Sequence, residues 1–248
     1  MKVEVCVVFS AFVLMHFCAG QYFGYRDLNA PPPPPLPFPP CLATDVACQR
    51  RGLRTFFYLM DAGHRGMRPV DPSYVNSVTV TQPERRASVV FRRLNVTGVG
   101  WTKLVERKFN LQDNRSGVKF LSNLHATGEI VVNLAERFNP LTALITLDIS
   151  DVETNITYKW EGVRGIDNED YLVIGQERIA ARNSRVPTYF LQPEGEETNM
   201  IHEILQRNPS TLDHIGVEIT MAVMYSVVDN FRLFAMSVPV RYYYQYYF

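Results

Sequence analysis

The chain has 248 residues and no net formal charge, with 25 Lys and Arg side chains against 25 Asp and Glu. Its paired arginines, such as Arg50-Arg51 and Arg92-Arg93, are scattered among acidic and apolar residues. Binding to a phosphate backbone requires basic side chains gathered on one face. The composition therefore excludes proteins that bind nucleic acid through a strong positive field, and we expect no nucleic-acid partner.

The first 20 residues have the layout of a secretory signal peptide. Lys2 precedes an apolar run from Val5 to Cys18, and the small residues Cys18 and Gly20 lie where signal peptidase prefers them. The run is too short to span a membrane. We therefore expect cleavage near Gly20 and secretion of a chain of 248 − 20 = 228 residues with no membrane attachment. That length is sufficient for a sizeable core.

The cysteines and the glycosylation sequons agree with an extracellular destination. Cys6 and Cys18 leave with the signal peptide, so the secreted chain keeps Cys41 and Cys48, which we expect to form one local disulfide. N-glycosylation requires the pattern Asn-x-Ser/Thr in a secreted protein, where x is any residue except proline. Three positions meet this requirement: Asn95, Asn114 and Asn155.

Both ends of the expected secreted chain have biased composition. Residues 21–40 include the run APPPPPLPFPP from Ala30 to Pro40, which favours an extended polyproline II conformation. We interpret this segment as a stiff spacer, with a ligand for a proline-binding module as the alternative. Residues 241–248, RYYYQYYF, form a low-complexity aromatic tail.

The first predicted element of the folded region is an amphipathic helix over residues 45–60. Val46, Leu53, Phe56, Phe57 and Met60 fall near one face at helical spacing. Thr44 or Asp45 is suited to cap its start, and two glycines shortly beyond residue 60 are suited to end it. The expected disulfide would join the first turn of this helix to the end of the proline-rich segment.

The middle of the chain has the period-two pattern of long, half-buried antiparallel strands. In residues 118–134 the even-numbered positions are mostly apolar and the odd-numbered ones mostly polar. In residues 141–160 the apolar set starts on odd numbers and changes to even numbers after Ser150-Asp151. Such a slip predicts a β-bulge. Asn155 then lies on the solvent face, where a glycan can be accommodated.

Further strands are predicted at residues 75–80, 171–181 and 188–191, and helices at residues 200–205 and 212–226. For residues 212–226 the β-branched content leaves a strand as the alternative. Long strands with one apolar face require a covering element. We therefore expect an α+β fold in which a strongly curved antiparallel β-sheet wraps a long helix.

Residues 41–239 contain an ordered series of motifs. A cysteine pair opens a helix, and a Pro-x-Asp-Pro segment, Arg68-Pro69-Val70-Asp71-Pro72, leads into a strand. The later motifs are Val96-Thr97-Gly98-Val99, Phe120 to Val132, Asp148 to Val152, Asn208-Pro209 and Val238-Pro239. In order and spacing this series resembles the insect haemolymph juvenile-hormone-binding and takeout family, within the tubular lipid-binding (TULIP) superfamily.

Four features depart from the family pattern. These are the tight loop between Cys41 and Cys48, the proline-rich segment at residues 21–40, the tyrosine-rich tail at residues 241–248, and the turn Arg137-Phe138-Asn139-Pro140 between two central strands. We accordingly divide the chain into a signal peptide (1–20), a proline-rich segment (21–40), a takeout-like domain of the TULIP super-roll type (41–240) and the tail (241–248).

The resemblance implies a non-enzymatic carrier in haemolymph or another extracellular fluid. Its ligand would be a juvenile hormone, another terpenoid, a fatty acid or an odorant, held in an apolar cavity between the long helix and the sheet. Aromatic and flexible side chains on inward faces are candidates to line that cavity, and packing of the core is the alternative role for each. The candidates are Phe56, Phe57, Met60, Phe120, Ile130, Trp160, Met221, Met224, Tyr225 and Phe234.

The sequence lacks the motifs of common enzyme classes. It contains no Gly-x-Ser-x-Gly elbow, His-Glu-x-x-His helix or phosphate-binding loop. Its histidines have no metal-ligand spacing, and we expect neither a cofactor nor a metal. A second hypothesis is a secreted structural or matrix protein that uses its proline-rich and tyrosine-rich ends for contacts. The sequence does not specify the ligand or the oligomeric state.

Overall fold

The computed structural model describes residues 36–82, 87–110 and 113–245. The chain falls into two compact units, and the larger comprises residues 36–165 and 169–248. Of the smaller unit, only the turn at residues 166–168 is described. The predicted signal peptide and most of the predicted proline-rich segment lie outside the described residues. The description below concerns the larger unit.

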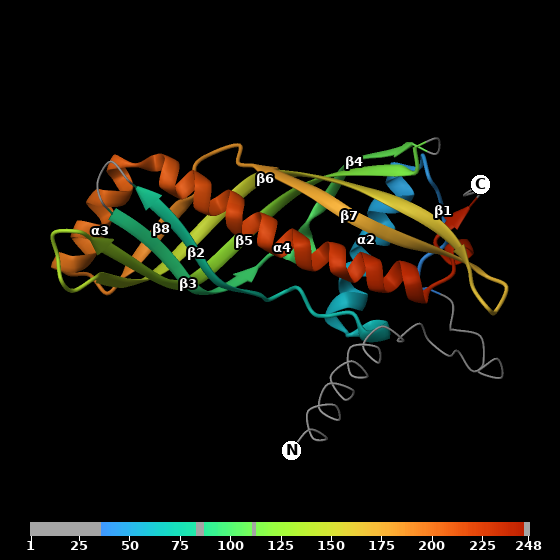
Figure 1. The fold of residues 1–248 in the computed structure, drawn as a ribbon, viewed down its shortest axis with the longest axis horizontal. Coiled ribbons are helices and arrows are strands. Elements are labelled where there is room, and N and C mark those ends of the chain that lie inside the picture. The colour runs from blue at the N-terminus through green and yellow to red at the C-terminus, as the bar shows by residue number, and fades with distance from the viewer. Residues whose placement is uncertain (1–35, 83–86, 111–112, 246–248) are drawn as a thin grey trace, which may run out of the picture. The chain divides into compact units, whose positions relative to one another are not determined.

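A seven-stranded antiparallel sheet forms the main layer (Figure 1). Its centre is the pair of long strands β5 and β6, and each of them carries two shorter strands end to end along its outer edge. Strands β3 and β4 flank β5, strands β7 and β8 flank β6, and β2 pairs with β3. The bounds are β2 Ser73–Gln82, β3 Ala87–Thr97, β4 Lys103–Asn110, β5 Arg115–Leu134, β6 Leu141–Arg164, β7 Asp170–Arg182 and β8 Thr188–Gln192.

The predicted alternation of the two central strands is confirmed. The even-numbered side chains of β5 from Val118 to Ala126 are buried, and their odd-numbered neighbours are half-buried or exposed. In β6 the buried set changes from odd to even numbers across Ser150-Asp151, where two residues of β6 face the single residue Asn123 of β5. The Asn123 Oδ1 accepts a hydrogen bond from the Asp151 amide at 2.7 Å, which secures the bulge.

Three α-helices are present among the described residues: α2 Val46–Asp61, α3 Glu196–Arg207 and α4 Pro209–Ser237. The helix predicted at residues 45–60 is therefore confirmed, with the Asp45 carboxylate as its N-cap accepting from the Cys48 amide at 2.9 Å. The helical prediction for residues 212–226 is also confirmed, because they lie within α4.

The sheet curves around α4, as predicted for an α+β fold of this kind. Strands β2 and β7 lie at opposite ends of the strand order, yet α4 contacts both of them as well as the central strand β6 (Figure 1). A flat sheet could not bring both edges to one helix. The curvature buries the apolar faces of β3, β5 and β6 against α4 in one large core, which includes Phe91, Ile130 and Val223.

The proline-containing corner before β2 is held by side-chain hydrogen bonds. Asn230 of α4 accepts from the Arg68 amide at 2.7 Å and donates to the Arg68 carbonyl at 2.8 Å. The Asp71 carboxylate accepts from the amides of Gly98 and Gly100. Gly98 immediately precedes η3, the short 3₁₀ helix Val99–Trp101 between β3 and β4, and Gly100 lies within it. The corner therefore fixes both α4 and the passage from β3 to β4.

The two ends of the larger unit meet in a small parallel pair, β1 Cys41–Leu42 with β9 Tyr244–Gln245. The disulfide Cys41–Cys48, which the sequence predicts, joins β1 to the first turn of α2. Tyr244 is buried and packs in a second core cluster with Trp160 and Leu172. The beginning of the tyrosine-rich tail is thus part of the folded structure, because its aromatic rings cover apolar surface at the end of α4.

Candidate functional site

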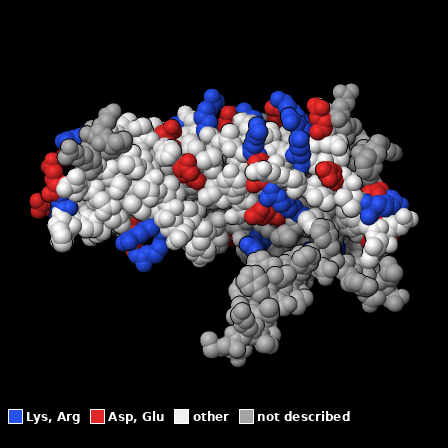
Figure 2. Space-filling model, in the orientation of Figure 1, with Lys and Arg blue, Asp and Glu red and all other residues white. Residues whose placement is uncertain are grey.

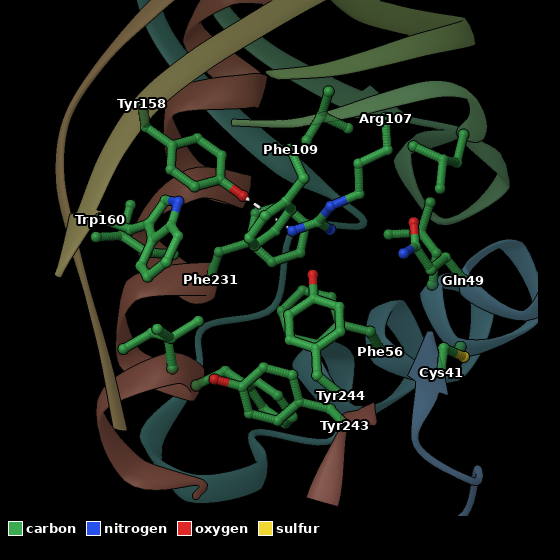
Figure 3. Close-up of a pocket in the computed structure, with 18 of the residues that line it drawn as sticks. Cys41, Gln49, Phe56, Arg107, Phe109, Tyr158, Trp160, Phe231, Tyr243 and Tyr244 are labelled. Atoms are coloured by element: carbon green, nitrogen blue, oxygen red, sulfur yellow. Dashed lines mark hydrogen bonds between the residues drawn. The ribbon is translucent and has the colours of Figure 1, made fainter. Parts of the chain in front are cut away.

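A cavity of about 140 Å³ lies where α2, the last turns of α4 and strands β4 to β7 come together (Figure 3). Helix α2 contributes Gln49, Gly52, Leu53 and Phe56, and α4 contributes Phe231, Phe234 and Ala235. Strands β4 to β7 supply most of the remaining wall. The two ends of the unit complete the lining with Phe38, Cys41, Tyr243 and Tyr244.

Aromatic residues make up half of the cavity lining. Phe56 stacks on Phe231 with ring centres 4.6 Å apart and meets Phe234 edge-on at 5.2 Å. Elsewhere in the wall, the ring centre of Phe109 lies 5.4 Å from that of Trp160 and 5.9 Å from that of Tyr244. Such offset and edge-on pairs stabilise the wall beyond simple area burial. They leave a surface suited to an apolar guest.

A glycine allows the amino-terminal segment to close against α2. A Cβ atom at Gly52 would lie 3.5 Å from the ring of Phe38, so the ring rests directly on the helix at this position. A larger side chain at position 52 would displace Phe38 from the cavity wall. The last residues of the proline-rich segment therefore contribute to the site.

A few polar groups interrupt the apolar lining. An Arg107 guanidinium nitrogen donates to the Tyr158 hydroxyl at 3.3 Å, and the guanidinium carbon lies 5.4 Å from the centre of the Phe109 ring and 5.2 Å from that of Tyr244. Figure 3 shows the Tyr244 hydroxyl pointing toward Arg107. Burial raises the pKa of Tyr244 to about 12, and the neighbouring Arg107 opposes that rise. The Tyr244 hydroxyl is therefore neutral at physiological pH.

Three buried polar atoms of the cavity wall have no hydrogen-bond partner: Arg107 Nε, Gln49 Oε1 and Trp160 Nε1. The Gln49 amide nitrogen is occupied, because it donates to the carbonyls of Leu42 and Ala43 at 3.1 and 2.8 Å. Enclosed polar atoms without partners cost free energy in a folded protein. They commonly mark a position that water or a ligand occupies.

Four of the ten side chains predicted to line a ligand cavity lie in this wall: Phe56, Phe120, Trp160 and Phe234. Four others are buried in the main core and do not line it: Phe57, Met60, Ile130 and Met224. Met221 is half-buried at the middle of α4, and Tyr225 exposes 46% of its surface. The structure thus brings four of the candidates together around the cavity at the carboxyl-terminal end of α4. The other six candidates lie outside the cavity wall.

The cavity also differs from the continuous axial cavity expected between the helix and the sheet. Its only α4 residues lie within the last two turns of that helix. Around the middle of α4 the side chains of Ile219, Val223 and Val227 are fully buried against the sheet. These branched side chains belong to the main core.

Sequence reasoning missed the polar centre of the site. Arg107 and Phe109 belong to β4, which has no regular alternation because its register shifts between Leu104 and Glu106. That shift turns Arg107 and Phe109 inward after the buried Leu104. In the sequence, the only sign of this register shift is the pair of adjacent apolar residues Leu104 and Val105.

The predicted glycosylation sites differ in accessibility. Asn114, in the turn before β5, and Asn155, on the outer face of β6, are exposed. Asn95 is half-buried in β3, and its Oδ1 is enclosed without a hydrogen-bond partner. Solvent exposure is a requirement for a glycan, so Asn114 and Asn155 meet it better. Glycosylation at all three positions stays a prediction.

Charges on the face drawn in Figure 2 are mixed, with Lys and Arg beside Asp and Glu and large uncharged areas between them. Within residues 36–82, 87–110 and 113–245, no group of three or more His, Cys, Asp or Glu is placed to hold a metal ion. None of the helices in the same ranges has the length and apolar character needed to cross a membrane.

Comparison with known proteins identifies the fold. No family model and no curated protein matches the sequence. Among solved structures, Takeout 1 of Epiphyas postvittana is similar with a TM-score of 0.68 and 12% identity, over 83% of this chain and 99% of that one. A lipopolysaccharide-binding protein gives a TM-score of 0.42 and 12% identity, over 81% of this chain and 40% of that one. The chain therefore has the fold of Takeout 1, with little sequence in common.

Proposed function

We propose that this chain, which has the fold of Takeout 1, is a secreted, non-enzymatic carrier of a small hydrophobic molecule and a divergent member of the takeout group. The observation that carries the proposal is the aromatic cavity at the end of α4. Binding pockets for small molecules combine a mostly apolar lining with a few placed polar groups. The cavity has this composition.

The volume of the cavity limits the part of a ligand that it can hold. An engineered apolar cavity of about 150 Å³ binds benzene, whereas pockets for drug-sized ligands measure about 300 to 1,000 Å³. A volume of about 140 Å³ therefore suits a single ring or a short alkyl segment. A longer ligand would extend toward solvent or displace the rings of Phe231 and Phe234.

The energetics are sufficient for carriage of such a ligand. Burial of about 200 Å² of apolar surface contributes on the order of 5 kcal/mol. Loss of translational and rotational freedom offsets part of this gain. The resulting affinity is moderate and permits release, as a carrier requires. Each additional polar contact between the protein and the ligand would raise the binding affinity.

Two measurements on the full-length secreted protein test the proposal. Native mass spectrometry followed by solvent extraction should release a small apolar molecule. N-phenyl-1-naphthylamine, a neutral dye that fluoresces in apolar sites, should bind at one site per chain, with its phenyl ring in the cavity and its naphthyl group extending toward solvent. The matched variant Phe56→Trp should weaken dye binding, because it fills the cavity, whereas Tyr225→Trp on the exposed face of α4 should not. A chain that neither retains a lipid nor binds the dye would refute the carrier function.

No observation favours the structural-protein hypothesis as a second function. Tyr243 and Tyr244 line the cavity, and Tyr244 is buried, so crosslinking through its ring would require the end of the domain to open. Tyr246 and Tyr247 lie outside the described residues. The hypothesis makes one distinct prediction, that trimming the two ends abolishes assembly while the fold persists.

A further inference from the structure

Arg107 is the one charged side chain among the residues that line the cavity. A guanidinium group stays protonated at every pH that a protein experiences. Burial in an apolar site opposes that charge, while the oxygens of Tyr244, Tyr158 and Tyr243 favour it, with the net effect that the pKa of Arg107 is raised. A permanent positive charge therefore lies at the centre of an aromatic cavity (Figure 3).

This charge has no carboxylate partner among the described residues. No Asp or Glu oxygen in residues 36–82, 87–110 and 113–245 forms a salt bridge with Arg107. The acidic residue adjacent in sequence, Glu106, pairs instead with Lys108 at 3.2 Å, and both are exposed. The groups around the Arg107 guanidinium are the hydroxyls of Tyr158 and Tyr244 and two aromatic ring faces, and its Nε has no hydrogen-bond partner.

A second arginine of the same domain shows how such a charge is ordinarily satisfied. Arg232 of α4 is also half-buried, and it forms salt bridges with Glu177 and with Asp229. Taking a cation out of water costs several kcal/mol unless an anion and further hydrogen bonds compensate for it. Arg107 has the same requirement, and residues 36–82, 87–110 and 113–245 do not supply the anion.

We infer that Arg107 binds the carboxylate of an amphipathic ligand whose apolar part lies against Phe56, Phe231 and Phe234. This inference rests on the proposed carrier function and specifies its ligand class. The planar guanidinium can bind a carboxylate through two parallel hydrogen bonds. The unpartnered Nε and one terminal nitrogen would supply them.

Other donors of the wall support an acidic head group. Tyr158 and Tyr244 carry hydroxyls on the side of Arg107, and the enclosed Trp160 Nε1 has a hydrogen without an acceptor. The one unpartnered acceptor of the wall, Gln49 Oε1, is outnumbered by these donors. The site is therefore richer in donors than in acceptors, which favours an acid over the corresponding alcohol or ester.

Titration calorimetry with two probes of equal chain length tests the inference. Octanoate and octan-1-ol share the alkyl segment and differ in the charged head group. The natural full-length protein should bind octanoate about 10- to 100-fold more tightly than octan-1-ol, the range expected for a hydrogen-bonded charge pair away from water. Arg107→Met should reduce octanoate affinity to that of octan-1-ol. Arg107→Lys, which retains the charge but not the planar fork, should retain part of the preference.

Controls separate the possible failures. Arg182→Met makes the same change in net charge on an exposed β7 residue paired with Glu153, and it should leave the preference unchanged. Thermal unfolding and binding of N-phenyl-1-naphthylamine verify that each variant is folded with an open cavity. Dye binding together with equal affinity for the two probes, or with no octanoate binding, would overturn the role of Arg107 alone. Loss of all binding in the natural protein would overturn the carrier function as well.

Discussion

Substitution of Gly98 by alanine should be among the most damaging single changes in the domain. Gly98 has a φ of +97°, in the left-handed region that alanine rarely adopts. A Cβ atom at this position would lie 2.4 Å from the backbone oxygen of Asn123 in β5. Two separate costs therefore apply, one from the backbone conformation and one from the steric overlap.

The magnitude follows from the two costs. Left-handed backbone costs an alanine about 1 to 2 kcal/mol. Relief of the overlap requires a shift of the backbone, and β5 cannot move freely at Asn123, because this residue faces the bulge of β6. A forced displacement of a paired strand raises the total to about 3 to 5 kcal/mol.

Urea unfolding followed by circular dichroism measures the effect, with Gly66→Ala as the matched control. Gly66 has a φ of +78°, but no atom lies within 4 Å of the position that an alanine methyl group would take, so its substitution should cost only about 1 to 2 kcal/mol. With a denaturant dependence of about 3 kcal/mol per molar, Gly98→Ala should lower the midpoint by about 1 M or more. Equal midpoints for the two variants would refute the close approach of Gly98 to β5.

Three further predictions concern the junction of the two ends. Replacing Cys41 and Cys48 by serine should lower the free energy of unfolding by about 2 to 3 kcal/mol, seen as a lower urea midpoint, since the bridge joins residues only 7 positions apart. Truncation after Val240 removes Tyr243 and Tyr244 from the cavity wall, and it should cost at least about 3 kcal/mol and abolish dye binding. A truncated protein that still bound the dye would contradict this assignment. The folded chain keeps Tyr244 neutral up to a pKa of about 12, whereas an unfolded tyrosine ionises near pH 10, so stability should be full below pH 10 and fall as the pH rises through 12. Tyr244→Phe should flatten that decline in urea midpoints measured between about pH 9 and 12.

The central sheet could be predicted from the sequence because its signal is local and repeated. Strands β5 and β6 each alternate over many residues, and the slip at Ser150-Asp151 is visible because apolar side chains continue on both sides of it. Helix α2 could be predicted equally well from the sequence, since Asp45 caps it and Phe56, Phe57 and Met60 define its buried face. In these elements, local preference and tertiary packing favour the same structure.

The cavity could not be predicted in the same way, because it depends on contacts between distant segments. Its wall joins Phe38 and Cys41 to Tyr243 and Tyr244, which lie near the opposite end of the chain. The parallel pairing of Cys41 with Tyr244 leaves no periodic mark in either segment. The buried Arg107 was equally hidden, since its neighbours in sequence are the charged residues Glu106 and Lys108.

Two of the segments that depart from the expected takeout pattern, the proline-rich segment and the tyrosine-rich tail, contribute residues to the cavity wall. Phe38 belongs to the proline-rich segment and rests on Gly52, while Tyr243 and Tyr244 belong to the tyrosine-rich tail. The disulfide and the β1–β9 pair hold these two segments together at the end of α4. A change in either segment would alter the wall around Arg107 while leaving the sheet and α4 intact. Under the proposed carrier function, ligand choice would depend on these two ends together with Arg107, whereas the sheet and α4 would supply the fold.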